Sequence, residues 1–355
     1  MKAVLFVDDE PRLLDGLKRL LRPQRTEWEM LFAGSGEEAL SVMERQQVDI
    51  LVTDMRMPEM DGAELLRRVH ERFPGVTRIV LSGQFDDETG LRATPYAHQF
   101  LSKPCDPEKL KAAITRTAGS CQVLPDGATR KIVNAIGALP SPPGVYAKLT
   151  QAINDPNTSV ADISAIIGRD VALSAKVLQL ANSAFFGLAH EVTRVKEAIS
   201  ALGLDTLKQL VLSAEILKEF RAAQPIPHFS IDEFERHATL SADIAVHLPG
   251  RDDASVRALA ALLHDTGKLV LASRLPLQFA EAHRISVIEK IAGHQAEECV
   301  FGTSHAEVGA CLLNLWGLPP TVTSAIARHH HPAAPAHPAA HLDLVAVVHL
   351  ASALA

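Results

Sequence analysis

The stretch Val48–Gly62, which reads VDILVTDMRMPEMDG, decides the fold of the first part of this 355-residue chain. It opens with a short apolar run of the kind that fills a parallel strand covered on both faces. Asp54 closes this run, so we expect its carboxylate at the carboxyl end of a strand, where open α/β sheets hold their chemistry. Pro58 stops the strand from continuing, and Asp61 predicts the N-cap of a following helix. The alternative is an ordinary strand-to-helix loop that ends in an acid.

Strand and helix patterns alternate on both sides of this stretch. The expected strands are Lys2–Val7, Trp28–Ala33, the run that ends at Asp54, Thr77–Leu81 and Phe100–Leu101. The expected helices are Pro11–Leu21, residues 35–46, Asp61–Phe73 and Pro107–Thr117. Strands that alternate with helices predict a parallel, doubly wound sheet over residues 1–120.

Composition restricts the class of protein. Hydrophobic residues make up 47% of the chain and charged residues 22%, which is typical of globular proteins. The formal net charge of −7 argues against a broad nucleic-acid-binding surface. No apolar run has membrane-spanning length, and Asp8, Asp9 and Glu10 interrupt the N-terminal apolar segment, which excludes a signal peptide. We therefore expect a cytoplasmic protein of two or three domains.

Polar side chains gather where the expected strands end. Asp8 and Asp9 follow the first strand, Asp54 ends the third, Ser82 ends the fourth, and Lys103 follows the fifth. In a parallel sheet these ends lie along one edge, and crowded carboxylates there call for a cation such as Mg²⁺. A lysine and a hydroxyl at the same edge would bind phosphoryl oxygens. An Asp carboxylate attacking phosphorus would form an aspartyl phosphate.

This constellation resembles the receiver domain of two-component response regulators, through VDDE at Val7–Glu10, DMRMPEMDG at Asp54–Gly62, Ser82, and KP at residues 103–104. The resemblance implies a flavodoxin-like sheet in strand order 2-1-3-4-5 and phosphorylation by a histidine kinase or phosphotransfer protein. It also implies that Asp54 is the phosphoacceptor and that Lys103 contacts the phosphoryl group. The Mg²⁺ ligands would be Asp9, Asp54 and the backbone carbonyl of Arg56, with Asp8 acting through water. Ser82 and Phe100 would be the switch residues.

Two local features of the receiver-like part are also expected. The helix that the resemblance implies between Ser82 and Phe100 is expected to be short or irregular, because Gly90 and Pro95 interrupt it. The bond between Lys103 and Pro104 is a candidate cis peptide that would aim the lysine.

Strand signals nearly vanish after the first 120 residues. Residues 121–138 read as a partly helical linker, and residues 139–355 as an all-α domain. Ser159 and Asp162 predict a capping box, and Gly203 predicts a C-cap. The expected helices are about 126–136, Ala161–Arg169, Val171–Asn182, Val195–Leu202, Leu207–Phe220, Ile231–Leu248, Ser255–Ala272, Ile285–Val300, His305–Trp316, Thr321–His329 and Leu342–Ala355.

Histidines concentrate in this helical part, and thirteen of the sixteen lie in His228–His349. Neutral imidazole together with carboxylate is a usual ligand set for borderline metals. The candidates for a metal site, vestigial or intact, are His237, His264, Asp265, His305, His329 and His330. Each histidine taken alone has an ordinary alternative as a surface or hydrogen-bonded core residue.

The motif LLHDTGK at Leu262–Lys268 looks like the HD superfamily of metal-dependent phosphohydrolases, and residues 139–340 resemble the HDOD domain more closely. That resemblance is carried by LPSPPGVYAKL at 139–149, VALSAKVLQLANSAFFG at 171–187, AISALGLDTLKQLVL at 198–212 and HAEVGACLLNLWGLPPTVTSAIARHHHP at 305–332. HDOD domains generally look like non-catalytic relatives of HD enzymes. Here Ser352 stands where the closing aspartate of an HD site belongs, and the GYP element of cyclic-di-GMP phosphodiesterases is missing.

The resemblances favour a response regulator in which phosphorylation of Asp54 is relayed to a non-catalytic HDOD domain that acts through other signalling proteins or nucleotide-signalling partners. The sequence is compatible with a homodimer. The alternative is a receiver-gated, metal-dependent HD phosphohydrolase or phosphodiesterase, and only that alternative calls for a transition metal. A DNA-binding output is not favoured, because Arg194, Lys196, Lys208 and Lys218 are scattered and no basic recognition helix is evident.

Overall fold

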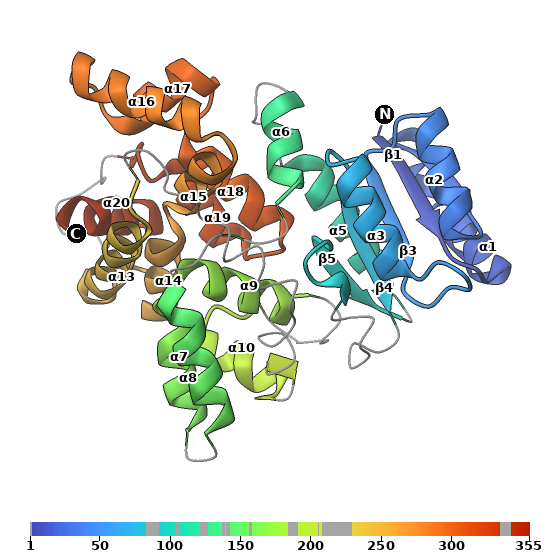
Figure 1. The fold of residues 1–355 in the computed structure, drawn as a ribbon, viewed down its shortest axis with the longest axis horizontal. Coiled ribbons are helices and arrows are strands. Elements are labelled where there is room, and N and C mark those ends of the chain that lie inside the picture. The colour runs from blue at the N-terminus through green and yellow to red at the C-terminus, as the bar shows by residue number, and fades with distance from the viewer. Residues whose placement is uncertain are drawn as a thin grey trace.

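A computed structural model describes residues 2–82, 92–103, 105, 107–120, 127–136, 139, 143–155, 158–183, 191–204, 206–207, 229–333 and 342–355. An α/β part at the N-terminal side leads into a part made of helices (Figure 1). Within the described residues, no helix combines the length and the apolar character needed to cross a bilayer.

The α/β part is a five-stranded parallel sheet in the order β2-β1-β3-β4-β5, as predicted. The strands are β1 (Lys2–Val7), β2 (Trp28–Ala33), β3 (Ile50–Asp54), β4 (Thr77–Ser82) and β5 (Gln99–Ser102). β3 is central and fully buried, and its Asp54 pairs with Leu81 of β4. At the same edge Ser82 pairs with Ser102, which brings the ends of β3, β4 and β5 together.

Helices cover both faces of the sheet, because successive strand residues point to opposite sides. Val4 and Phe6 pack with Leu14 of α1 (Pro11–Leu20) and Ile114 of α5 (Pro107–Ser120). Leu5 and Val7 belong to the other cluster, which includes residues of α2 (Gly36–Arg45) and α3 (Gly62–Arg72). A 3-10 turn, η1 (Arg22–Thr26), joins α1 to β2.

The remaining helices are α6 (Gly127–Asn134), α7 (Pro143–Asn154), α8 (Val160–Ile167), α9 (Val171–Ala181), α10 (Val195–Leu202), α13 (Ile231–His247), α14 (Ala254–Leu263), α15 (Thr266–Arg274), α16 (Pro276–Glu289), α17 (Gly293–Phe301), α18 (His305–Leu315), α19 (Pro320–Arg328) and α20 (Leu344–Leu354). Two expected helices are wrong. The segment Ser255–Ala272 breaks at His264-Asp265, where Asp265 leaves helical geometry. The segment Ile285–Val300 breaks after α16, because Lys290 takes a left-handed conformation with φ of 53°.

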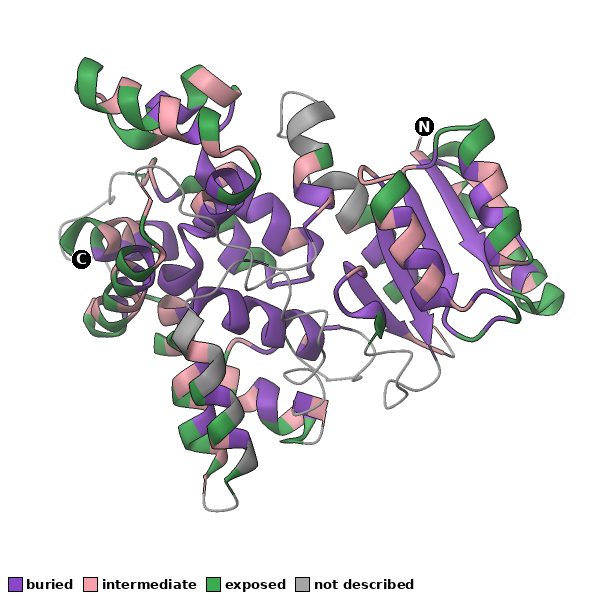
Figure 2. Cartoon of the chain, in the orientation of Figure 1, coloured by how far each residue is buried: buried purple, intermediate pink, exposed green. Residues whose placement is uncertain are grey.

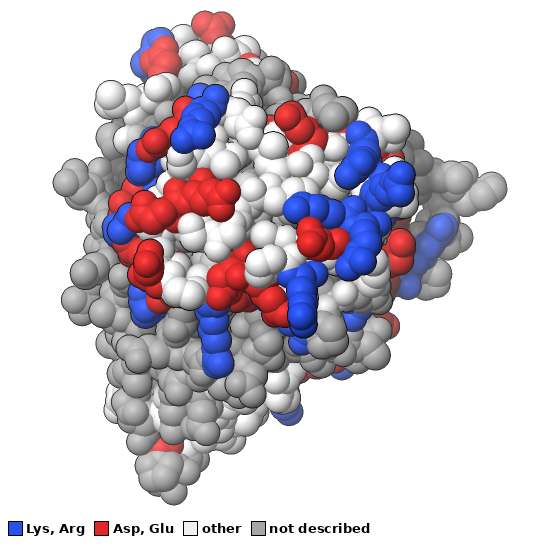
Figure 3. Space-filling view, turned by 90° about the vertical axis from the view of Figure 1, so that its right-hand side faces the viewer, with Lys and Arg blue, Asp and Glu red and all other residues white. Residues whose placement is uncertain are grey.

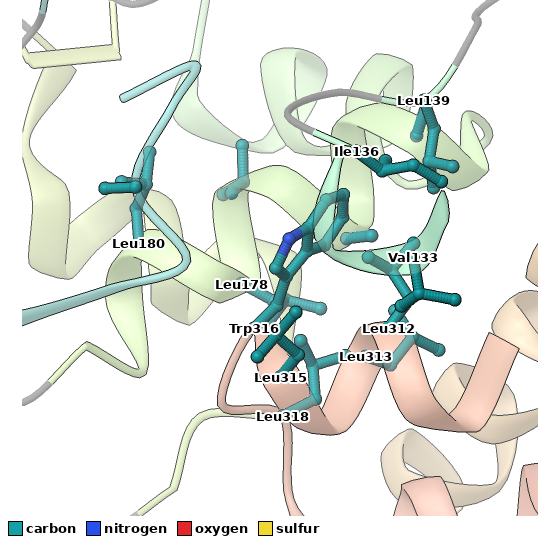
Figure 4. Packing of buried hydrophobic residues seen from close by; sticks show 14 of the residues in the cluster. Val133, Ile136, Leu139, Leu178, Leu180, Leu312, Leu313, Leu315, Trp316 and Leu318 are labelled. Atoms are coloured by element: carbon teal, nitrogen blue, oxygen red, sulfur yellow. The ribbon is translucent and has the colours of Figure 1, made fainter. Parts of the chain in front are cut away.

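The two parts share a buried interface. α9 (light green in Figure 1) lies beside β5, and the C-terminal end of α18 packs near α5 and α6. Trp316, which follows α18, packs with Val133 and Ile136 at the end of α6 (Figure 4). Buried residues, drawn in purple, run through the sheet, α9, α18 and α14 (Figure 2). One hydrophobic cluster therefore extends from the α2–α3 face of the sheet into the helical part.

The surface at the receiver end carries charges of both signs. Acidic and basic side chains lie interspersed on the face that Figure 3 shows, with basic ones gathered toward the right of the view. Ion pairs join α2 to α3 through Arg68–Glu37 and Arg72–Glu44. The described residues of this face thus form no continuous basic surface of the kind nucleic acid binds.

Three sequence expectations fall outside the described residues. These are the segment around Gly90 in the expected irregular helix, the peptide bond to Pro104, and most of the expected helix Leu207–Phe220.

Candidate functional site

The loop after β3 fixes the position of Asp54. Gly62 donates its N–H to the carbonyl of Met55 at 2.9 Å. A Cβ at Gly62 would collide with the carbonyl of Asp54 and lie 2.8 Å from the Cα of Met55, so only glycine fits. Asp61 caps α3 as predicted, since its side chain accepts a hydrogen bond from the N–H of Glu64. This close turn places the Asp54 carboxylate at the edge of the sheet.

Lys103 joins two carboxylates at this edge. Its Nζ lies 2.6 Å from Oδ1 of Asp54 and 2.7 Å from Oδ2 of Asp8. Both carboxylates are nearly buried, with Asp8 3% and Asp54 8% exposed. Burial lowers the pKa of Lys103, because it disfavours the charged amine. The hydrogen bonds to Asp54 and Asp8 have the larger effect and raise this pKa above its ordinary value.

The other predicted receiver residues surround this pair. The N–H of Arg56 donates to Oδ2 of Asp54 at 3.1 Å. The backbone N–H of Lys103 donates to the carbonyl of Ser82 at 2.8 Å, which ties the ends of β4 and β5 together. Phe100 is buried, and Asp9 is exposed beside Asp8. The structure therefore brings Asp8, Asp54, Lys103 and the backbone of Ser82 and Arg56 to one edge.

This edge fits a divalent cation. Oxygen ligands are what Mg²⁺ prefers, and Asp8, Asp9 and Asp54 supply them. The Lys103 ammonium bridges Asp8 and Asp54, so positive charge already lies between these two carboxylates.

Six residues of the helical part form a second cluster, here called the histidine cluster: His237 on α13, His264 and Asp265 between α14 and α15, His305 at the start of α18, and His329 and His330 after α19. Asp265, only 2% exposed, lies at its centre. Its Oδ1 is 3.0 Å from Nε2 of His305 and 3.9 Å from Nε2 of His329. Its Oδ2 is 3.3 Å from Nε2 of His264 and 3.8 Å from Nε2 of His237.

Backbone carbonyls fix the tautomers of two of these imidazoles. Nδ1 of His264 is 2.6 Å from the carbonyl of Ala261, and Nδ1 of His329 is 2.7 Å from the carbonyl of Ile326. A carbonyl only accepts, so each Nδ1 carries the proton and each Nε2 presents a lone pair. Burial, with His264 as the next contribution, lowers the pKa of His329 to about 3 and keeps it neutral.

Those Nε2 atoms face the Asp265 carboxylate but lack hydrogen-bond partners within the described residues. Neither Nε2 of His264 nor Nε2 of His329 makes a hydrogen bond, although both are fully buried. Two triads have ligand atoms all within 4.8 Å of one another: His237 with His264 and Asp265, and His305 with His329 and His330. Buried nitrogen lone pairs around a carboxylate fit a borderline transition metal.

Glu297 is a cluster residue that sequence reasoning missed. Its Oε2 accepts from Nδ1 of His305 at 2.6 Å and from the backbone N–H of His305 at 2.7 Å. Burial lowers the pKa of His305, but the Glu297 carboxylate raises it, and the net result is a pKa above the ordinary value. Glu297 lies on the preceding helix α17, and no spacing motif marks it.

A cavity of about 350 Å³ opens on this cluster. Phe229, Phe234 and Phe279 line it beside His237 and Lys268, and the ring of Phe229 contacts the rings of the other two phenylalanines. Nζ of Lys268 lies 2.6 Å from Oδ2 of Asp265. Ser352 does face the cluster, with its Oγ 3.4 Å from Nε2 of His237, and so stands at the place where a closing aspartate was expected.

Two family models match the chain. The response regulator receiver domain matches residues 4–115, and the HDOD domain matches residues 139–332. The chain belongs to the HDOD family. Its receiver domain precedes the HDOD domain, and both domains were predicted from the sequence motifs.

Known proteins are similar to this chain over parts of its length. The hydrogenase transcriptional regulatory protein HoxA of Cupriavidus necator is 39% identical over 110 residues, which are 30% of this chain and 22% of HoxA. An uncharacterized protein of Treponema pallidum is 27% identical over 200 residues, 56% of this chain and 39% of that protein. The chain thus spans less than half the length of these two relatives.

One solved structure shares the fold over more of the chain. The MmoQ response regulator of Methylococcus capsulatus Bath has a TM-score of 0.52 and 20% identity, covering 61% of this chain and 85% of that chain. At this identity the similarity establishes the fold alone.

Proposed function

We propose that this HDOD protein is a phosphorelay response regulator whose phosphoacceptor is Asp54. The observation that carries the proposal is the bridge from Lys103 to both Asp54 and Asp8 at the carboxyl edge of the sheet. The donor is a histidine kinase or a phosphotransfer protein, the class of partner with which receiver domains typically interact.

The pocket residues divide the chemistry of transfer among them. An oxygen of Asp54 forms a bond to phosphorus as the phosphorus–nitrogen bond of the donor histidine breaks, and the imidazole leaves. The ammonium of Lys103, which lies 2.6 Å from Asp54, offsets negative charge on the transferring group. Asp9, Asp54 and the Arg56 carbonyl, with Asp8 acting through water, would hold Mg²⁺, which would supply further charge stabilisation.

The HDOD domain is the output in this proposal, through contact with other signalling proteins or nucleotide-signalling partners. Its helices α9 and α18 contact the receiver around the start of β5, so a change at the phosphoacceptor edge would reach them along this strand. The chain needs no DNA-binding surface for such an output.

Calorimetric titration with beryllofluoride and Mg²⁺ tests the phosphoacceptor. Beryllofluoride occupies the place of a phosphoryl group on a carboxylate, so wild-type protein should bind one equivalent and Asp54→Ala none. Asp49→Ala is the matched control, since Asp49 lies at the opposite end of β3 and caps the backbone of Ala3. Equal binding by wild type and Asp54→Ala would end the proposal.

A second candidate function is metal-dependent phosphohydrolysis at the histidine cluster. The observation that favours it is the pair of buried, unpartnered Nε2 lone pairs on His264 and His329 around Asp265. The cluster residues would hold the metal, which would supply an activated water, and Lys268 would bind phosphate beside it. Ser352 in place of an anionic ligand weakens this candidate.

Elemental analysis of protein purified without chelator separates the two functions. The enzyme candidate predicts a stoichiometric transition metal that His264→Ala loses and that His247→Ala retains, because His247 is exposed at the end of α13. Metal-free wild-type protein that also takes up no metal on dialysis would contradict the enzyme candidate and leave the phosphorelay proposal intact.

A further inference from the structure

Two helices reach from the receiver to the neighbourhood of the histidine cluster. α18 begins at His305, inside the cluster, and ends at Leu315, against the receiver. α9 ends beside the receiver, and its N-terminal Val171 donates to Glu235, two residues before His237. Of these two, α18 alone contributes a cluster residue.

The receiver end of α18 is attached to β5 by a side chain next to the switch aromatic. Nε2 of Gln99 donates to the carbonyl of Leu315 at 3.0 Å. Oε1 of Gln99 accepts from Arg116 of α5 at 3.1 Å. Gln99 is 4% exposed and directly precedes Phe100, so movement of β5 near Phe100 acts on the last turn of α18.

The cluster end of α18 is in backbone contact with α15. A Cβ at Gly267 would collide with the carbonyl of His305 and lie 2.8 Å from the backbone nitrogen of Gly309. No side chain separates the two helices here, so α15 cannot stay in place when α18 shifts along its axis. Since α15 starts immediately after Asp265, such a shift moves Asp265 and His305 together. It therefore changes the distances from Asp265 to His237 and His329, now 3.8 Å and 3.9 Å.

We propose that α18 couples the two sites: occupation of the Asp54 pocket changes the geometry of the histidine cluster through the contact of Gln99 with Leu315. The proposal rests on the proposed phosphoacceptor function and adds the route and the residue by which the signal leaves the receiver. Coupling between sites is reciprocal, so ligands of the histidine cluster alter the affinity of the Asp54 pocket by the same factor.

α9 offers a competing route that a matched substitution can separate. Nε2 of Gln179 donates to the carbonyl of His98 at 2.9 Å, and Nζ of Lys176 donates to the carbonyl of Thr94 at 2.8 Å. Gln99 and Gln179 are both buried glutamines at the domain interface, but only Gln99 contacts α18.

Hydrogen exchange of the full chain, with and without beryllofluoride and Mg²⁺, tests the route. In wild type, binding should change exchange at least about fivefold in peptides that cover residues 262–269 and 305–315, the lower end of usual coupling factors. Peptides of α16, which packs chiefly against α17, should change less. Gln99→Leu should keep protection around Asp54 and lose the distant change, whereas Gln179→Leu should keep both.

Every outcome of this experiment either supports or contradicts the proposed coupling. Beryllofluoride protection around Asp54 without any change at residues 262–269 would overturn the coupling and leave the phosphoacceptor function standing. If the change in exchange at residues 262–269 and 305–315 is lost in Gln179→Leu and kept in Gln99→Leu, the route through α18 is overturned. A uniform change that includes α16 would be global stabilisation and would also overturn it. No protection around Asp54 in wild type would overturn the proposed function and the coupling together.

Discussion

At the scale of the residue, Gly62 has little freedom to change. Alanine there would press its Cβ against the backbone of Asp54 and Met55, so Gly62→Ala should lower the free energy of unfolding by about 1–3 kcal/mol. Gly16→Ala on α1 is the control, because a Cβ at Gly16 meets nothing within 4 Å. The control should raise stability by about 0.5–1 kcal/mol. Urea denaturation measures both, and an unchanged Gly62→Ala would contradict this reading of the loop.

Residue identity was enough to predict which side chains meet at the Asp54 pocket. It was not enough to predict contacts that depend on how helices pack. Asp8, Asp54 and Lys103 could be placed together because parallel strands deliver their ends to one edge. Glu297 could not be placed beside His305, since that contact depends on how α17 packs. Gln99 likewise reads as an ordinary strand residue until α18 is seen against it.

At the scale of the element, α6 is docked onto the receiver by a buried His98. Nδ1 of His98 accepts from the N–H of Arg78 at 2.9 Å, and Nε2 lies 2.9 Å from the carbonyl of Asn134, so the ring is neutral with its proton on Nε2. Burial, then the charge of Arg78, holds the pKa of His98 well below its ordinary value, and the more distant His70 and Lys176 add to this.

This arrangement predicts a pH dependence of stability. The unfolded chain takes up a proton on His98 as the pH falls through about 6.5, and the native state does not. The free energy of unfolding should therefore fall on acidification below that pH, with a His98 contribution of up to about 1.4 kcal/mol per pH unit. His98→Gln, which can keep both hydrogen bonds without titrating, should show a shallower decline between pH 7 and 5. Equal slopes in urea denaturation would contradict the assignment.

Element ends were predictable where a local side chain makes them. The capping box of Ser159 with Asp162 and the C-cap at Gly203, whose φ is 80°, are both confirmed. The break at His264-Asp265 was not predicted, because packing of these two buried residues overrides helical periodicity. The left-handed Lys290 was not predicted either, since residues other than glycine rarely adopt that conformation.

At the scale of the whole molecule, Trp316 holds the two domains together. It is 1% exposed, packs with Val133, Ile136 and Leu178 (Figure 4), and lies in a cluster that runs from the receiver into the HDOD domain. Trp316→Ala should cost about 3–5 kcal/mol and split one thermal transition into two. Calorimetry checks this against Leu277→Ala, 78% exposed on α16, which should shift stability by less than about 0.5 kcal/mol. A single, unshifted transition in Trp316→Ala would show that the interface adds little.

The account depends most on covalent phosphorylation of Asp54, and intact-mass measurement after incubation with acetyl phosphate tests it directly. Wild-type protein with Mg²⁺ should gain one phosphoryl group, and chelation of Mg²⁺ or Asp54→Asn should prevent the gain. Wild-type protein that gains no phosphoryl group, or an Asp54→Asn variant that gains it equally, would contradict the account.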